Sequence, residues 1–140
     1  MSSRTAIVDY ALQRRALLAG VRAGRVSPDE VCDAHPYLQR AATYHGEASA
    51  TTCPMCRREQ LTTVRYIYGD ELRHVSGQAK TAREIDAIAD AHPGFTVYVV
   101  EVCRGCSWNH LLLSYIATAD PVPEAGRSER RDRRRRVQSP

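Results

Sequence analysis

Apolar residues in the first third of the chain recur at helical rather than strand spacing. Residues 4–22 carry such a pattern among arginines, which predicts a helix. A capping box at residues 27–30, with Pro at the first helical position, opens a short second helix. Pro36 opens a third helix that ends at Gly46. Residues 1–46 are therefore predicted to form a helical unit.

The middle of the chain changes to a strand pattern and then returns to helical spacing. Residues 61–68 are rich in Thr, Val, Tyr and Ile, which favours a strand. Residues 71–75 are predicted to form a return strand across a two-residue turn at residues 69–70, because Gly can take the first central position. A second capping box at residues 81–84 opens a helix that stops at residues 92–94.

Two strongly apolar strands are predicted at residues 95–102 and 107–117. Both are apolar on both faces, so each face needs cover, which we expect from the N-terminal helices and the inserted helix near residues 81–91. The predicted fold class is α+β, with the N-terminal helical unit packed on an expanded antiparallel zinc ribbon. The ribbon domain spans residues 47–120, and residues 121–140 form a separate tail.

The net charge of +4 comes entirely from this tail. Residues 1–120 hold 13 basic and 13 acidic residues, whereas residues 121–140 hold seven Arg and three acidic residues. The tail consists mainly of Pro, Gly, Ser and Arg, so it is predicted to be disordered. Its arginines are candidates for contact with nucleic-acid phosphates, and the alternative is a solubilising end. These candidates are Arg127, Arg130, Arg131, Arg133, Arg134, Arg135 and Arg136.

Two Cys-x-x-Cys pairs carry the strongest chemical signal in the chain. Cys53, Cys56, Cys103 and Cys106 supply the four thiolates that a closed structural zinc site needs. The pairs are separated by 46 residues, against roughly 15–20 in the common pattern. The longer loop costs about 1 kcal/mol in closure entropy. Structural zinc contributes on the order of 10–16 kcal/mol, so one structural Zn²⁺ is predicted.

The alternatives to a structural zinc site are a redox dithiol, plain core cysteines and a catalytic zinc. A redox dithiol would open a helix in a βαβ unit, a pattern that this chain lacks. A catalytic zinc would recruit a further ligand type, and His110, four residues past Cys106, is instead predicted to pack along the last strand or at the surface. Cys32 and His35 have Cys-x-x-His spacing without a matching second pair nearby. Cys32 is therefore predicted to be a buried helix cysteine.

Aromatic residues offer a second candidate surface. Tyr66 and Tyr68 share one strand face by alternation, and Tyr98 is expected on a neighbouring strand. Such a face can stack the bases of single-stranded nucleic acid. The preferred hypothesis is that these rings pack under the helices. Trp108 is likewise predicted to be a core residue beside the zinc site.

Four segments together resemble an uncharacterised actinobacterial zinc-ribbon family, a domain of unknown function. They are Cys-Pro-Met-Cys at residues 53–56, the Tyr-Ile-Tyr-Gly-Asp stretch at 66–70, and residues 99–103 and 106–111. The likeness extends over residues 4–117. The resemblance implies the zinc site and the fold, but it implies no activity.

The cysteine pattern and the apolar runs also predict a compartment. Without a secretion signal, paired cysteines at short spacing are typical of metal binding in a reducing environment, so the cytoplasm is expected. The first apolar run is interrupted by Asp9, and the chain has no apolar run long enough for a membrane span.

No catalytic motif stands out in this sequence. It has no Gly-rich phosphate loop, no serine nucleophile elbow and no His-Glu-x-x-His. We expect a non-enzymatic adaptor that docks on a nucleic-acid machine, RNA polymerase or the ribosome, while the arginine tail contacts nucleic acid. The alternative is a protein–protein interaction or metal-responsive module without nucleic-acid contact. No small-molecule substrate and no membrane partner are predicted.

Overall fold

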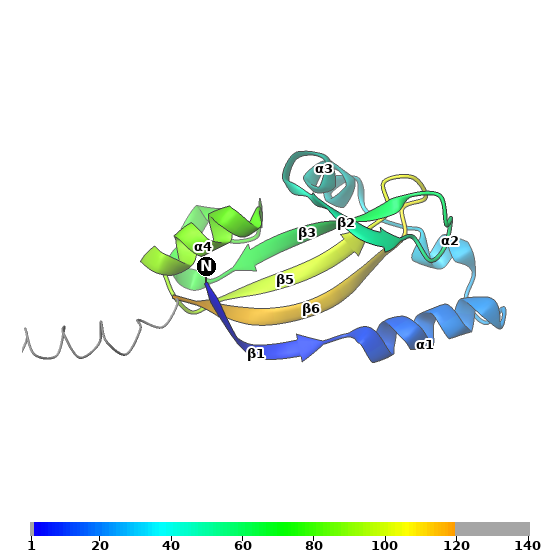
Figure 1. Cartoon of the computed structure of the whole chain (residues 1–140), viewed down its shortest axis with the longest axis horizontal. Helices are drawn as coiled ribbons and strands as arrows, with labels where there is room; N and C mark the ends of the chain where they lie inside the picture. The colour runs from blue at the N-terminus through cyan, green and yellow to red at the C-terminus, as the bar shows by residue number, and fades with distance from the viewer. Residues whose placement is uncertain (1, 120–140) are drawn as a thin grey trace, which may run out of the picture.

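The computed structural model describes residues 2–119, which form a curled antiparallel sheet with helices at both ends (Figure 1). The order of the strands is β1-β6-β5-β3-β2, and β4 pairs with β3 off this path. The strands are β1 (Ser3–Asp9), β2 (Glu47–Thr52), β3 (Gln60–Tyr68), β4 (Ala79–Lys80), β5 (Phe95–Val102) and β6 (Asn109–Thr118). The α+β fold class is as predicted.

The helices begin where the sequence signals place them, except for the first helix and for a 3₁₀ segment that the sequence did not predict. They are α1 (Ala11–Arg22), α2 (Pro28–Val31), α3 (Pro36–His45), α4 (Ala82–Ala91) and the 3₁₀ segment η1 (Asp70–Val75). Both predicted capping boxes are present, Ser27 with Glu30 at α2 and Thr81 with Glu84 at α4. Across residues 2–119, none of the helices combines the length and apolar character needed to cross a membrane.

The first element is a strand, which corrects the helix predicted over residues 4–22. β1 pairs with β6, and its register shifts between Thr5 and Val8, where Ala6 has a φ of 50°. The helix begins only at Ala11. Pairing at a sheet edge satisfies a row of backbone hydrogen bonds, and this gain depends on a partner strand more than 100 residues away. Local periodicity cannot reveal it.

The 3₁₀ segment η1 replaces the return strand predicted at residues 71–75. The Leu72 N–H donates to the Gly69 carbonyl at 3.1 Å, so Gly69 leads into a helical turn rather than a hairpin. The Leu72 side chain is buried in the same core cluster as Ile67. The chain turns inward at η1 to bury this leucine. The strand that pairs with β3 is therefore the later segment β4.

Different helices cover the two faces of the sheet. α4 packs Ile85 and Ala89 into one buried cluster with side chains of β3, β5 and β6. α3 packs Ala42 against Val64 and Val102 in another cluster. Alternation along β3 places these clusters on opposite faces, which agrees with the expectation that helices cover both.

A third buried cluster connects the N-terminal helices to the cysteine loops. Its buried members are Leu18 of α1, Val31 of α2, Leu61 of β3, Trp108, Cys53 and Cys103. Trp108 is fully buried there, as predicted. The candidate metal centre is therefore continuous with the hydrophobic core.

Candidate metal centre

The first knuckle, residues 53–59, joins β2 to β3. The Cys53 N–H donates to the Glu59 carbonyl at 2.8 Å, and the Arg57 N–H donates to the Cys53 carbonyl at 3.1 Å. Arg57 adopts a left-handed φ of 57°, which closes the turn. The Met55 N–H donates to the Cys53 Sγ at 3.4 Å. Backbone geometry thus aims this sulfur into the turn.

The second knuckle, residues 103–108, repeats this arrangement between β5 and β6. The Cys103 N–H donates to the Trp108 carbonyl at 2.8 Å, and the Ser107 N–H donates to the Cys103 carbonyl at 3.0 Å. Ser107 adopts a left-handed φ of 69°, at the position equivalent to that of the left-handed residue in the first knuckle. The Cys106 N–H donates to the Cys103 Sγ at 3.3 Å.

The four sulfurs of the two knuckles converge on one point. All four Sγ atoms lie within 4.8 Å of one another. The Sγ atoms of Cys53 and Cys106 are 3.6 Å apart, as are those of Cys56 and Cys103. Sulfurs at the zinc–sulfur bond length of a tetrahedral site would be separated by about 3.8 Å. The four predicted ligands are thus brought together in an arrangement that can bind a metal ion.

The thiols at this centre differ in acidity. Burial raises the pKa of Cys53 and of Cys103 above the ordinary value of 9.0. Burial also raises the pKa of Cys106 to about 11. Backbone N–H groups of the first knuckle lower the pKa of Cys56 to about 7. Because metal ligation requires thiolates, metal binding must be coupled to proton release.

The α2–α3 link and α3 itself brace the second knuckle. The Ala34 N–H donates to the Ser107 carbonyl at 3.0 Å. The Gln39 Nε2 donates to the Cys103 carbonyl at 3.0 Å and to the Ser107 Oγ at 3.1 Å. Within residues 2–119, the helices make no corresponding hydrogen bond to the first knuckle. The N-terminal part of the chain therefore fixes one half of the centre directly.

Cys32 lies against this centre, which the sequence did not predict. Its Sγ is 3.8 Å from the Cys106 Sγ. Cys32 follows α2 directly and is partly exposed, so the expectation of a buried helix cysteine is wrong. The Cys-x-x-His spacing marks Cys32 as a candidate ligand but does not indicate where the residue lies. The preceding residue, Val31, packs beside Trp108, and this packing places Cys32 next to the sulfurs.

The two histidines considered as ligands have other partners. His35 Nδ1 accepts a hydrogen bond from the Tyr37 N–H at 3.1 Å and caps α3. His110 Nδ1 lies 2.6 Å from the Leu111 carbonyl, and its ring stacks on Trp108 with 6.0 Å between centroids. Neither belongs to the sulfur cluster. His110 is a packing residue, as expected.

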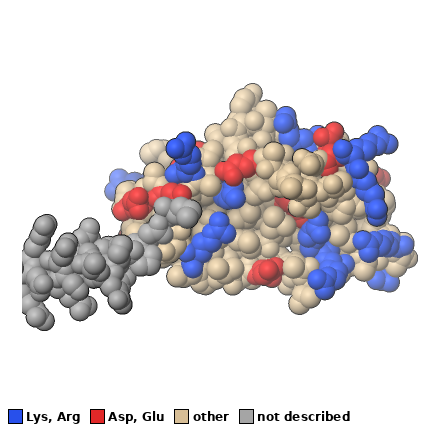
Figure 2. Space-filling view, in the orientation of Figure 1, with Lys and Arg blue, Asp and Glu red and all other residues tan. Residues whose placement is uncertain are grey.

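Exposed arginines gather at the end of the molecule that carries α1, α2 and the knuckles (Figures 1 and 2). We name this surface the basic end; its residues are Arg15, Arg22, Arg25, Arg57, Arg58 and Arg104. Four thiolates around a divalent cation would carry a net charge of −2, which the arginines that adjoin the cysteines, Arg57, Arg58 and Arg104, would help to offset. The tail arginines predicted to contact phosphates, within residues 127–136, lie outside the described residues.

Three tyrosines share one sheet face, as predicted. Tyr66 and Tyr98 are register partners, and the rings of Tyr68 and Tyr98 meet edge-on with 5.5 Å between centroids. They border a shallow hollow of about 600 Å³. Tyr68 is 46% exposed, so the hypothesis that these rings all pack under helices is wrong for this residue. We name these three residues the tyrosine face.

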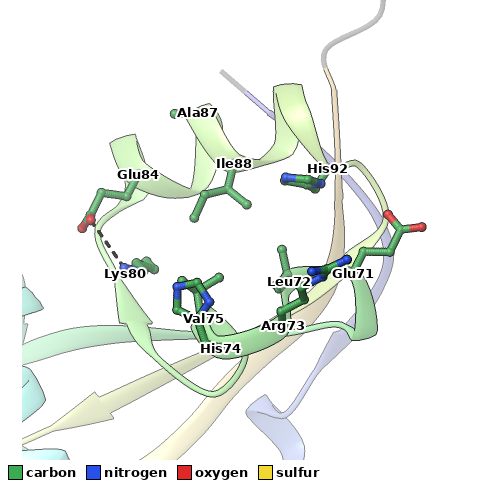
Figure 3. Close-up of a pocket in the computed structure, with 10 residues that line it drawn as sticks. All are labelled: Glu71, Leu72, Arg73, His74, Val75, Lys80, Glu84, Ala87, Ile88 and His92. Atoms are coloured by element: carbon green, nitrogen blue, oxygen red, sulfur yellow. Dashed lines mark ion pairs between the residues drawn. The ribbon is translucent and has the colours of Figure 1, made fainter.

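A larger hollow of about 850 Å³ lies between η1 and α4 (Figure 3). Leu72 and Val75 of η1 and Ile88 of α4 line it with apolar groups from opposite sides, and an ion pair between Lys80 and Glu84 at 3.9 Å closes one end. This groove is at the opposite end of the sheet from the knuckles (Figure 1). It contains none of the thiols.

The fold and the site define a small α+β protein with a four-cysteine centre between two hairpin knuckles. The chain belongs to the family of unknown function DUF5318, whose model matches residues 1–133. It is 54% identical over 112 residues to proteins described as uncharacterised from Mycobacterium bovis and from two strains of Mycobacterium tuberculosis. The match covers 80% of this chain and 82% of each relative. No solved structure gives a significant match. The resemblance to an actinobacterial family of unknown function is confirmed.

Proposed function

We propose that the four-cysteine centre holds one structural Zn²⁺. The observation that carries this proposal is the convergence of four Sγ atoms within 4.8 Å. Zinc accepts four thiolates in tetrahedral geometry, and a shell completed by sulfur leaves no position for water or substrate. The module is therefore proposed to be non-enzymatic, with the metal stabilising the fold.

The function that we propose is that of a cytoplasmic adaptor docking on a nucleic-acid machine, such as RNA polymerase or the ribosome. Two charge features support it: the seven arginines of residues 121–140 and the exposed arginines of the basic end. Phosphate contacts of this kind position a protein on nucleic acid without reading its sequence. A reducing compartment keeps the zinc thiolates available, which supports the cytoplasm.

X-ray absorption at the zinc edge tests the metal part of the proposal. The full chain, purified without a metal-binding tag, is expected to hold one zinc per molecule with a sulfur-only shell. A nitrogen or oxygen neighbour, or a chain that folds fully without metal, would contradict a closed structural site.

The salt dependence of binding tests the adaptor part. Binding to single-stranded RNA and DNA oligonucleotides is expected to weaken steeply with salt, and deletion of residues 121–140 should reduce the slope. A chain with the seven tail arginines replaced by glutamine separates charge from length. Affinity purification from the native cell, with and without nuclease, would then identify the machine. A salt-insensitive, tail-independent interaction would exclude phosphate contact.

The tyrosine face favours a second candidate, a protein–protein interaction or metal-responsive module. Exposed tyrosines are enriched at protein interfaces because they bury a large area with little loss of conformational entropy. In this case Tyr68→Ala should abolish capture of a protein partner, whereas deletion of residues 121–140 should leave it unchanged. Weak zinc affinity would point to the metal-responsive form.

A further inference from the structure

The centre contains one thiol more than a tetrahedral metal ion needs. The Sγ of Cys32 lies 3.8 Å from that of Cys106. This separation is close to the 3.6 Å between the paired sulfurs of the centre itself. Cys32 is not among the four cysteines whose sulfurs all lie within 4.8 Å of one another. It therefore contacts one predicted ligand from outside the four-sulfur set.

The fold holds Cys32 in this position from both sides. Before it, Val31 is buried in the cluster that contains Trp108. After it, the Ala34 N–H donates to the Ser107 carbonyl at 3.0 Å. The Asp33 carboxylate accepts a hydrogen bond from the Asn109 Nδ2 at 3.0 Å. The approach of the two sulfurs is thus set by backbone and side-chain contacts to the second knuckle.

Solvent reaches this edge of the centre more readily than it reaches the sulfurs of Cys53 and Cys103. Cys32 and Cys106 are both partly exposed, as is Cys56 on the first knuckle. Cys53 is 1% exposed and Cys103 is 0% exposed. A small oxidant dissolved in water therefore meets Cys106 with a free thiol already beside it.

We propose that Cys32 is the resolving thiol for Cys106, so that a peroxide converts the pair to a disulfide and withdraws Cys106 from the metal. This inference rests on the proposed metal site. A disulfide needs the sulfurs about 2.05 Å apart, so they must approach by less than about 2 Å. The Cys53 sulfur is slightly closer to Cys106, at 3.6 Å, but a bound metal would keep it engaged as a ligand, whereas the Cys32 sulfur lies outside the ligand set.

The chemistry balances with one peroxide molecule. The Cys106 thiolate attacks one peroxide oxygen, the O–O bond breaks, and hydroxide leaves, which gives a sulfenic acid. The Cys32 thiol then attacks the Cys106 sulfur, the S–O bond breaks, and water leaves with the Cys32 proton. The two sulfurs lose two electrons, and the two peroxide oxygens gain them. A thiol reductant reverses the disulfide and restores the fourth ligand.

Without a resolving thiol, further peroxide oxidises a sulfenic acid to sulfinic acid, which thiol reductants do not reverse. The function of the pair is therefore to make loss of the metal reversible. The expected difference between the native chain and a Cys32 variant lies in recovery after oxidation rather than in the rate of the first attack by peroxide.

The test treats the zinc-loaded full chain with hydrogen peroxide and then with dithiothreitol. Released zinc is followed with a chromophoric chelator, and disulfides are located by mass spectrometry of peptides prepared without reduction. The native chain is expected to lose two free thiols, to yield a Cys32–Cys106 peptide pair and to rebind zinc after reduction. Cys32→Ser and Cys32→Ala should bind zinc normally, but most of their zinc binding should stay lost after the same cycle.

Met55→Leu is the matched control, because Met55 lies in the first knuckle and its oxidation would otherwise contribute to the result. This variant should behave like the native chain. The inference is overturned if Cys32 remains free to alkylation after zinc release, or if Cys32→Ser recovers as fully as the native chain. A chain that never binds zinc contradicts the proposed function instead, and peptide mapping of that metal-free chain still decides whether Cys32 and Cys106 pair.

Discussion

The two knuckles have nearly the same backbone geometry but different surroundings. Each closes with a hydrogen bond back to its first cysteine carbonyl, and each has a left-handed residue four positions after that cysteine, Arg57 in the first and Ser107 in the second. The second knuckle is braced by Gln39 and by the α2–α3 link. In the first, two backbone N–H groups stabilise the Cys56 thiolate.

The two halves of the centre therefore contribute in different ways. The first knuckle supplies a sulfur that is half ionised near neutral pH, Cys56. The second supplies the equivalent sulfur of Cys106, which stays protonated until a metal displaces the proton. The helices hold the second knuckle in place through hydrogen bonds, whereas within residues 2–119 they make no such bond to the first. Five experiments test this difference between the knuckles.

Replacing a ligand cysteine should have the largest effect. Cys53→Ser and Cys103→Ser should each lose stoichiometric zinc and the cooperative thermal transition, because structural zinc contributes on the order of 10–16 kcal/mol against a total domain stability of roughly 5–15 kcal/mol. Circular dichroism and zinc analysis are the measurements, with Cys32→Ser as the matched control that keeps zinc. Full helicity with a normal transition in either ligand variant would show that the fold does not depend on the metal.

The pH dependence of zinc affinity should be the next largest effect. Below about pH 9 the three thiols with raised pKa are protonated in the metal-free chain, so binding zinc releases about three protons. The apparent affinity should therefore rise by up to roughly a thousandfold per pH unit. Below about pH 7 Cys56 adds a fourth proton, and the slope should steepen. Competition with a chelator of known affinity measures this.

The metal-free chain should show the opposite pH dependence. A thiol whose pKa is raised by folding loses its proton more readily in the unfolded chain, so ionisation above the unfolded value of 9.0 favours unfolding. Stability without metal should accordingly fall above about pH 9. Denaturant unfolding at several pH values measures how the stability of the chain changes with pH, with zinc and without it. If the two stabilities change with pH in parallel, the raised pKa values of the thiols are contradicted.

Removing the brace should have an intermediate effect. Gln39→Ala deletes the hydrogen bonds to the Cys103 carbonyl and the Ser107 hydroxyl, which should cost about 1–3 kcal/mol in unfolding free energy. Gln60→Ala is the matched control at the exposed start of β3, and it should change stability by less than about 0.5 kcal/mol. If Gln39→Ala and Gln60→Ala change the unfolding free energy equally, the hydrogen bonds of Gln39 do not brace the second knuckle.

Sequence reasoning predicted the elements whose signals are local. Capping residues such as Thr81 and Glu84 act within one turn, so α4 begins where expected. The four centre cysteines were also found, because two short spacings with the same ligand chemistry are informative without knowledge of the fold. The features that escaped prediction depend on distant partners. β1 exists because β6 is available for pairing, and Cys32 reaches Cys106 because α2 packs beside Trp108.

The smallest expected effect compares the two left-handed residues directly. An L-residue in this region costs roughly 1–2 kcal/mol, and part of the relief from glycine is offset by the entropy of the unfolded chain. Arg57→Gly should therefore stabilise the zinc-loaded chain by about 0.5 kcal/mol. Arg58→Gly, at a neighbouring exposed position without positive φ, should be neutral or destabilising.

Ser107→Gly relieves the same strain but also deletes the hydroxyl that accepts a hydrogen bond from Gln39. The lost bond is worth about 1 kcal/mol, so the substitution should be neutral or slightly destabilising. In a Gln39→Ala background that bond is already absent, and Ser107→Gly should become as stabilising as Arg57→Gly. Denaturant midpoints of the four chains complete the cycle. If Ser107→Gly has the same effect with and without Gln39, the hydrogen bond to the Ser107 hydroxyl contributes nothing, and the brace acts only through the carbonyls of Cys103 and Ser107.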